Sequence, residues 1–100
     1  MATITDFQGR TLTGAAANLP DRWHAESVRG GGFAQYKAGS GEIYAIVEFS
    51  HKVGGWSWRL CIHSIVPVAD NEYGTPCKTA LQGIRAVQRA AKRHSVERYF

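Results

Sequence analysis

Hydrophobic and polar residues alternate along two neighbouring stretches of the chain, EIYAIVEFSHK at 42–52 and WSWRLCIHSIV at 56–66. Alternation with a period of two is typical of strands that bury one face. The glycine pair at 54–55 between the stretches favours the positive φ angles of a tight hairpin turn. A two-residue turn there places Phe49 opposite Leu60 and Val47 opposite Ile62. We therefore expect an antiparallel strand pair with this register.

The expected register sorts the side chains onto two faces of the strand pair. The core face carries Trp58 and four apolar pairs: Val53 with Trp56, Phe49 with Leu60, Val47 with Ile62, and Ile43 with Val66. The opposite face carries Lys52 with Ser57, Ser50 with Arg59, Glu48 with Cys61, Ile46 with His63, and Tyr44 with Ile65. A shift by one residue would mix the two sets, so this separation supports the register.

Two more strands are predicted upstream, and a loop is predicted downstream. FAQYKA at 33–38 precedes turn residues at 39–41, and a hairpin there places Phe33 beside Val47 on the core face and Tyr36 beside Tyr44 on the other face. WHAESVR at 23–29 reads as a fourth strand, followed by three glycines. The turn-forming residues of 67–74 indicate that strand pairing stops there: Pro67, Asp70, Asn71 and Gly74.

A helix is predicted over 75–94, where Thr75 can cap the first turn and Pro76 takes a position that needs no N–H donor. At 100° per residue, one side of this helix is apolar and matches the core face of the strands: Ala80, Leu81, Ile84, Val87 and Ala91. The expected fold class is therefore α+β, an antiparallel three- to four-stranded meander at 23–66 with a C-terminal amphipathic helix packed on one face.

The length and composition indicate a single domain over 1–100. A hydrophobic content of 44% provides enough apolar surface for a folded core, and two cysteines without a short paired spacing indicate reduced thiols. No long apolar run and no signal-peptide layout occur, so we expect a cytoplasmic protein without a membrane partner. Residues 1–20 stay unassigned, since TITDFQGRTLT could form a strand pair and TGAAANL a helical turn.

Positive charge is concentrated in the last quarter of the chain. Residues 77–100 contain six Lys or Arg and one acid, whereas residues 1–76 contain six Lys or Arg and seven acids. On the predicted helix the cations form a stripe separate from the apolar side: Lys78, Arg85, Arg89, Lys92 and, at its edge, Arg93. Such a stripe suits an anionic partner surface, and its alternative interpretation is a solvated helix face.

A second candidate surface lies on the predicted sheet face away from the helix, where four residues form an apolar group: Tyr36, Tyr44, Ile46 and Ile65. An exposed sheet face of this kind needs a cover. The N-terminal segment could supply it through Ile4, Phe7, Leu12 or Leu19. The alternatives are an interface with a second copy of the chain, giving a homodimer, or with a foreign partner.

Side chains with catalytic chemistry are few. Cys61 and His63 share a predicted strand face with Glu48 opposite Cys61, which brings together a thiol, an imidazole and a carboxylate. No further group orients them, so we expect no catalytic residues. Cys77 near the predicted helix start is either a reactive thiol or a small buried side chain.

Metal and phosphate motifs are weak as well. Cys61 and His63 are the one closely spaced pair of metal-ligand residue types, with Cys77, His24, His51 or His94 as further candidates. Structural zinc sites use two such pairs, so we expect no metal and no cofactor. The segment RGGGF leads into a strand rather than a helix, which favours turns over a phosphate loop.

The order of three strands followed by a C-terminal helix at 33–94 resembles, in topology alone, the double-stranded RNA-binding domain. In that family a run of lysines opens the last helix and another helix precedes the first strand, whereas here Lys78 stands alone and no such first helix is predicted. That resemblance implies nucleic-acid binding through this helix. The chain also resembles, in size and in its lack of catalytic motifs, the small phage and mobile-element proteins of the anti-CRISPR kind. This second resemblance implies a non-enzymatic inhibitor or adaptor that occupies a host protein or nucleoprotein complex.

Three functional hypotheses follow in order of preference. The first is such an inhibitor or adaptor acting through the basic helix stripe. The second is a direct nucleic-acid-binding domain, which would lose affinity steeply with salt. The third is a small thiol enzyme, which would need an accessible cysteine of low pKa.

Overall fold

The computed structural model describes residues 4–5, 11–12, 14, 18–27, 34–50, 54–71 and 74–100. The strands are β1 (Ile4–Thr5), β2 (Thr11–Leu12), β3 (His24–Ser27), β4 (Ala34–Ser40), β5 (Ile43–Ser50), β6 (Gly55–Ile62) and β7 (Ala69–Asp70). They are followed by the helix α1 (Ala80–Arg93) and the short 3₁₀ helix η1 (Glu97–Tyr99).

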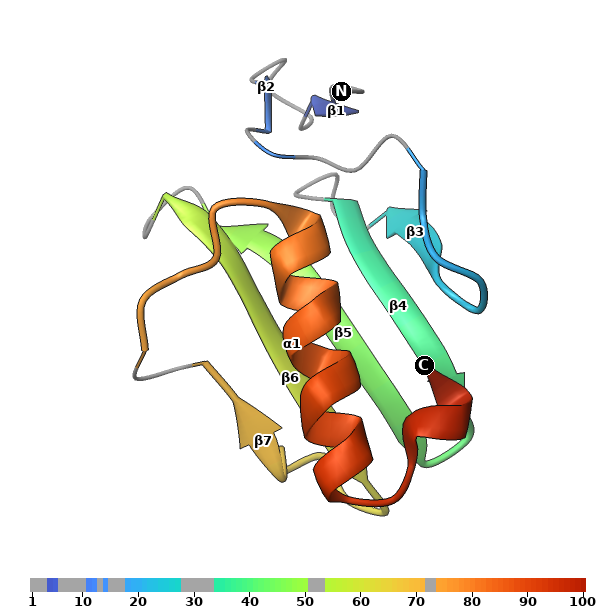
Figure 1. Cartoon of the computed structure of the whole chain (residues 1–100). Coiled ribbons are helices and arrows are strands. Elements are labelled where there is room, and N and C mark those ends of the chain that lie inside the picture. The colour runs from blue at the N-terminus through green and yellow to red at the C-terminus, as the bar shows by residue number, and fades with distance from the viewer. Residues whose placement is uncertain are drawn as a thin grey trace.

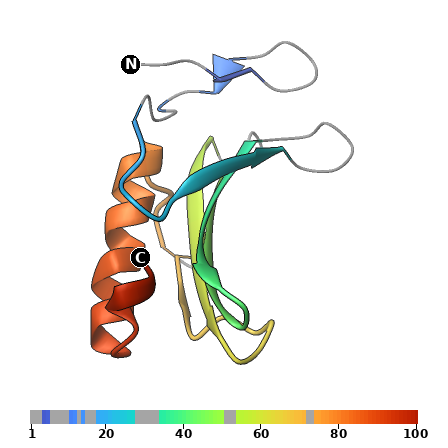
Figure 2. The same cartoon turned by 90° about the vertical axis from the view of Figure 1, so that its right-hand side faces the viewer.

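Strands β3 to β7 form one antiparallel sheet in chain order, and α1 packs across one face of it (Figures 1 and 2). The expected α+β meander with a C-terminal helix is thus confirmed, with five strands in place of three to four. Strands β1 and β2 form a separate antiparallel pair, so the strand interpretation holds for that part of residues 1–20. The carbonyl oxygen of Gly14 accepts a hydrogen bond from the N–H of Ala80 (2.9 Å), and this bond connects Gly14 to the start of α1.

The predicted partners in the β5–β6 hairpin are wrong, although the predicted faces are right. Phe49 pairs with Trp56, and Val47 pairs with Trp58. The connection spans four residues, 51–54, rather than two: Ser50 pairs with Gly55, and Gly54 (φ +71°) donates its N–H to the Ser50 carbonyl oxygen at 2.8 Å. Each strand residue therefore meets a partner four positions away from the expected one. An even shift leaves every side chain on its predicted face.

The predicted position of Tyr36 is wrong. Strand β4 continues to Ser40, which pairs with Ile43, so the turn lies at 41–42 and not at 39–41. This is an odd shift, and it moves every β4 side chain to the opposite face. Tyr36 consequently pairs with Val47 and lies in the core at 1% exposure. Phe33, Val53 and the glycines at 30–32 lie outside the described residues.

The β3 strand is confirmed over His24–Ser27, but the loop predicted at 67–74 contains a fifth strand. Ala69 and Asp70 pair with Leu60 and Arg59 of β6. The pairing then continues through a side chain: Asn71 accepts a hydrogen bond from the Trp58 N–H (2.9 Å) and donates one to the Trp56 carbonyl oxygen (3.2 Å). A turn-forming residue thereby completes a sheet edge.

The helix begins five residues later than predicted, at Ala80. Cys77 forms an isolated antiparallel bridge with Trp56, and this extended backbone excludes a helix at 75–78. Thr79 is the N-cap, and its side chain accepts a hydrogen bond from the N–H of Gln82 at 3.2 Å. The Gln82 side chain in turn accepts from the N–H of Lys78 (2.9 Å). The helix ends at Arg93, with His94 as the C-cap.

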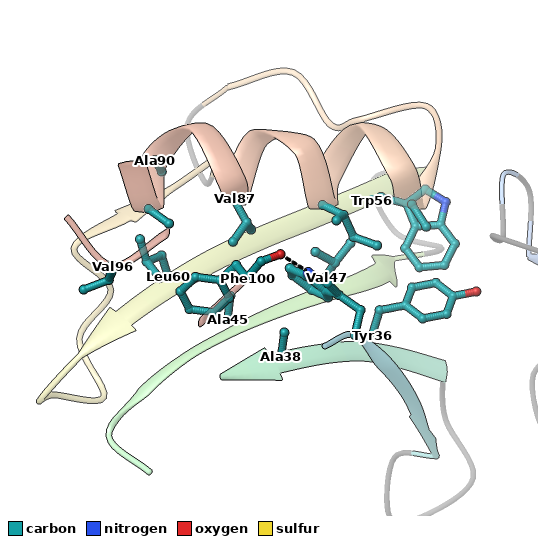
Figure 3. Close-up of a cluster of buried hydrophobic side chains, with 14 of the residues drawn as sticks. Tyr36, Ala38, Ala45, Val47, Trp56, Leu60, Val87, Ala90, Val96 and Phe100 are labelled. Carbon is teal, nitrogen blue, oxygen red and sulfur yellow. Dashed lines mark hydrogen bonds between the residues drawn. The ribbon is translucent and has the colours of Figure 1, made fainter. Parts of the chain in front are cut away.

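The core lies between α1 and the sheet (Figure 3). Trp56 is fully buried at its centre, with the Tyr36 ring stacked on it and the Phe49 ring edge-on, each at 5.4 Å between centroids. Leu60 is fully buried as predicted. Trp58, also predicted in the core, is only half-buried and packs against the edge of the core cluster. The largest buried side chains contributed by α1 are Ile84 and Val87.

Candidate functional site

The five predicted cations are all exposed, and four of them lie on α1. Lys78 lies before the helix, two residues ahead of its first turn, which corrects its predicted place on the helix. We call the set the basic face: Lys78, Arg85, Arg89, Lys92 and Arg93.

Small residues on the buried side of α1 set the direction of the basic face. Ala80, Gly83, Ala90 and Ala91 are buried, so the helix backbone approaches the sheet closely. A Cβ atom on Gly83 would lie 2.9 Å from a methyl group of Val47. This close contact fixes the rotation of the helix about its axis and holds the long cationic side chains on the opposite side.

The basic face carries no acidic partner within the described residues. The ion pairs among the described residues lie on the sheet and beside its turns: His24 with Glu26, Arg59 with Glu48, and His63 with Glu42. Two of the cations have a local role as well, because Lys92 and Arg93 in the last turn interact favourably with the negative end of the helix dipole. Arg85 and Arg89 lie mid-helix and have no such role.

The second predicted surface is not assembled as expected. Tyr36 lies in the core on the opposite face. Ile46 is 9% exposed and Tyr44 is half-buried, with the Lys37 ammonium 5.5 Å from the centre of the Tyr44 ring. Ile65 alone of the four is fully exposed. Leu19, one of the proposed covers of this face, instead packs against the core cluster.

The thiol, imidazole and carboxylate that the sequence offered as a catalytic candidate, and that were not expected to be catalytic, are apart. Cys61 faces Tyr44 rather than Glu48, is fully buried, and lies 3.9 Å from the Ile65 carbonyl oxygen, to which its thiol donates. A side-chain hydrogen bond with Cys61 that favours the protonated phenol is the main reason that the pKa of Tyr44 is raised. His63 follows the end of β6 in a left-handed conformation (φ 55°) and pairs with Glu42 at 2.8 Å. Glu48 pairs with Arg59 at 3.2 Å, as its diagonal position allows.

Neither the metal candidates nor the second cysteine form a recognisable site. Within the described residues, no three His, Cys, Asp or Glu side chains are close enough to hold one ion, and His51 is outside them. Cys77 precedes the helix and is half-buried. Burial raises the pKa of its thiol, whereas a position at a helix N-terminus would have lowered it.

The sequence interpretation missed an exposed apolar loop. It placed Val66 in the core opposite Ile43, but Ile43 pairs with Ile62, and Val66 is exposed in the loop between β6 and β7 together with Ile65 and Val68. Two shallow hollows adjoin this loop. One of about 220 Å³ is bordered by Trp58 and Pro67, and one of about 210 Å³ is bordered by Tyr44 and Ile65.

Comparisons with models of protein families, with curated proteins and with solved structures gave no match to this chain. Any functional conclusion therefore depends on its own residues. Among the described residues, no helix has the length and apolar character needed to cross a membrane.

Proposed function

We propose that this chain is a non-enzymatic binding protein that occupies an anionic surface of a protein or nucleoprotein complex with its basic face. In this role it acts as an inhibitor or adaptor, as small phage proteins of the anti-CRISPR kind do. The observation that carries the proposal is the exposure of five cations without an acidic partner among the described residues.

Electrostatic reasoning supports this role. Cations already paired on a surface contribute little to a partner, because they must first be separated from their own acids. The acids of the sheet are paired there instead, so Arg85 and Arg89 are available to a partner. A surface of one sign steers an oppositely charged surface during encounter and raises the association rate, and salt weakens this effect.

The choice of binding over catalysis has its own support. A thiol enzyme needs an accessible thiolate and a nearby base. Cys61 is buried and His63 points to Glu42, while burial raises the pKa of Cys77. The two hollows beside the apolar loop are open and shallow, and each is smaller than a typical small-molecule site.

The test compares three forms of the protein in affinity capture from a bacterial lysate, with and without nuclease. Arg85→Glu combined with Arg89→Glu reverses two charges on the basic face. Arg22→Glu combined with Lys37→Glu is the matched control, because it changes net charge equally at residues outside the basic face. We expect the first variant to keep the fold and lose its partner, and the control to retain it.

Capture of the same partner by the Arg85/Arg89 variant with unchanged affinity at low salt would contradict the proposal and leave the basic face as a solvated helix surface. Equal loss of partner capture in the Arg85/Arg89 variant and in the control variant would indicate an effect of net charge rather than a defined contact. Nuclease-sensitive capture with a steep salt dependence would instead favour direct nucleic-acid binding.

A further inference from the structure

Three aliphatic side chains lie exposed in the loop that joins β6 to β7. Ile65 is 87% exposed, Val66 68% and Val68 43%, and they are the exposed large hydrophobic residues of the described part of the chain. Contiguous exposed apolar groups of this kind mark interaction sites more often than isolated ones do. We call Ile65, Val66 and Val68 the apolar tip.

The apolar tip shares one end of the molecule with the last turn of α1. Both views show the loop after β6 and the C-terminal end of α1 at the same end (Figures 1 and 2). Lys92 and Arg93 in that turn are exposed. Glu42, an acid bordering the hollow beside Ile65, is already paired with His63 at 2.8 Å. This end of the protein therefore combines protruding aliphatic side chains with exposed cations.

We propose, in contrast to the expectation from the sequence of no membrane partner, that this end docks on an anionic lipid surface, with the apolar tip inserted below the headgroups and Lys92 and Arg93 contacting lipid phosphates. Charge complementarity favours such an occupant, because basic residues beside inserted apolar side chains are attracted to anionic headgroups. A bilayer also accepts protruding side chains without a preformed pocket.

Other occupants fit the same features less well. Nucleic-acid phosphates would pair with Lys92 and Arg93 but leave the aliphatic side chains in water. A second copy related by a two-fold axis would bring the same cations toward each other. Protein interfaces depend mainly on Trp, Tyr and Arg, whereas Val is under-represented among their strongest contacts.

The test is co-sedimentation with phosphatidylcholine vesicles that either contain or lack phosphatidylserine. We expect the protein to bind the vesicles with phosphatidylserine and to bind less as salt is raised. Ile65→Ser with Val66→Ser should weaken binding by about tenfold or more, because two aliphatic side chains no longer enter the bilayer. Ile65→Leu with Val66→Ile is the matched control and should bind like the original chain.

Lys92→Glu with Arg93→Glu tests the cations and should weaken binding by about twenty-fivefold or more, since each lost cation near an anionic surface contributes roughly a factor of five and the new carboxylates are repelled. The serine variant should keep its thermal unfolding midpoint, because both side chains are exposed. Failure of the original chain to bind phosphatidylserine vesicles would overturn the proposal. Equal binding by the serine variant, or equal binding to vesicles without phosphatidylserine, would overturn it as well.

Analytical ultracentrifugation distinguishes self-association of the chain from lipid binding. A dimer that the serine changes dissociate, together with absent vesicle binding, would assign the apolar tip to a second copy and reject the lipid surface. This inference goes beyond the proposed function and fails separately from it, because the decisive residues there are Arg85 and Arg89, in the middle of α1.

Discussion

At the scale of single residues, Asn71 shows how one side chain can change the meaning of a sequence pattern. Asp70 and Asn71 are typical turn residues, and their presence predicted a loop. The Asn71 amide nevertheless bonds the N–H of Trp58 and the carbonyl of Trp56 just beyond the two-residue strand β7. A short edge strand completed by a side chain gives no periodic signal, so the sequence pattern could not have revealed it.

Cys77 provides a residue-scale prediction on pH dependence. In a Cys61→Ala background, its alkylation rate should rise with pH around a midpoint above that of the same chain unfolded in urea, because burial raises the thiol pKa. The raised pKa means that the folded chain holds the proton more tightly. The associated stability is present below the unfolded pKa and is lost as pH rises through the folded pKa. A midpoint below the unfolded value would contradict this environment and indicate an activated thiol.

At the scale of elements, the parity of each turn decided which predictions held. In the β5–β6 hairpin the observed partners differ from the expected ones by four positions, which is an even number. Phe49, Val47 and Leu60 therefore stayed on the core face. The β4–β5 turn differs by an odd shift, so Tyr36 moved from the predicted outer surface into the core. The alternation of apolar residues predicts faces well, but it does not determine where a Gly-rich turn begins.

The start of α1 shows a similar limit. Thr75 before Pro76 and Thr79 before Gln82 both match the pattern of a helix N-terminus. The bridge between Cys77 and Trp56 keeps the backbone extended after Thr75, so the helix starts after Thr79 instead. This bridge joins residues that are far apart in sequence. A local pattern cannot report that contact. The basic side chains nevertheless remained exposed as predicted, because their spacing within the helix does not depend on where the helix begins.

The two candidate caps give a direct test at this scale. Thr79→Ala should lower the free energy of unfolding by about 1 kcal/mol, because the Gln82 N–H loses its side-chain acceptor at the helix end. Thr75→Ala is the matched control and should change it by less than about 0.5 kcal/mol, since Thr75 is exposed and lies before the extended bridge. Urea denaturation measures both changes. A larger effect at Thr75 than at Thr79 would place the helix start at the earlier residue.

At the scale of the whole molecule, opposite charges are distributed unevenly between the two layers. The sheet carries acids with their partners, such as Glu48 with Arg59, while α1 carries cations and no acid. This segregation was predictable, because it follows from composition along the chain. The apolar tip was not, because its exposure depends on where β6 ends and β7 begins.

The start of the five-stranded sheet, the helix α1 and the residue after η1 meet at Phe100. Its backbone oxygen accepts hydrogen bonds from the Trp23 indole N–H and from the Gln88 side chain, each at 3.0 Å. The Trp23 and Phe100 rings lie 6.2 Å apart between centroids, and both residues are nearly buried. The Phe100 oxygen therefore links the residue before β3 to the helix α1.

This shared acceptor predicts non-additive changes in stability. Trp23→Phe keeps a large ring but removes one donor, and Gln88→Leu removes the other, so either single change leaves the oxygen one side-chain partner. Each should lower the free energy of unfolding by about 1 kcal/mol. The double variant leaves a buried oxygen without either donor, and its loss should exceed the sum of the single losses by about 1 kcal/mol. Urea denaturation of the four proteins measures this coupling.

The control pair is Trp23→Phe combined with Ile65→Ala. These two residues share no partner, so their effects on the free energy of unfolding should be additive within about 0.5 kcal/mol. Additivity in the Trp23 and Gln88 pair would show that the two donors act independently and that Phe100 does not join the sheet to the helix through this oxygen.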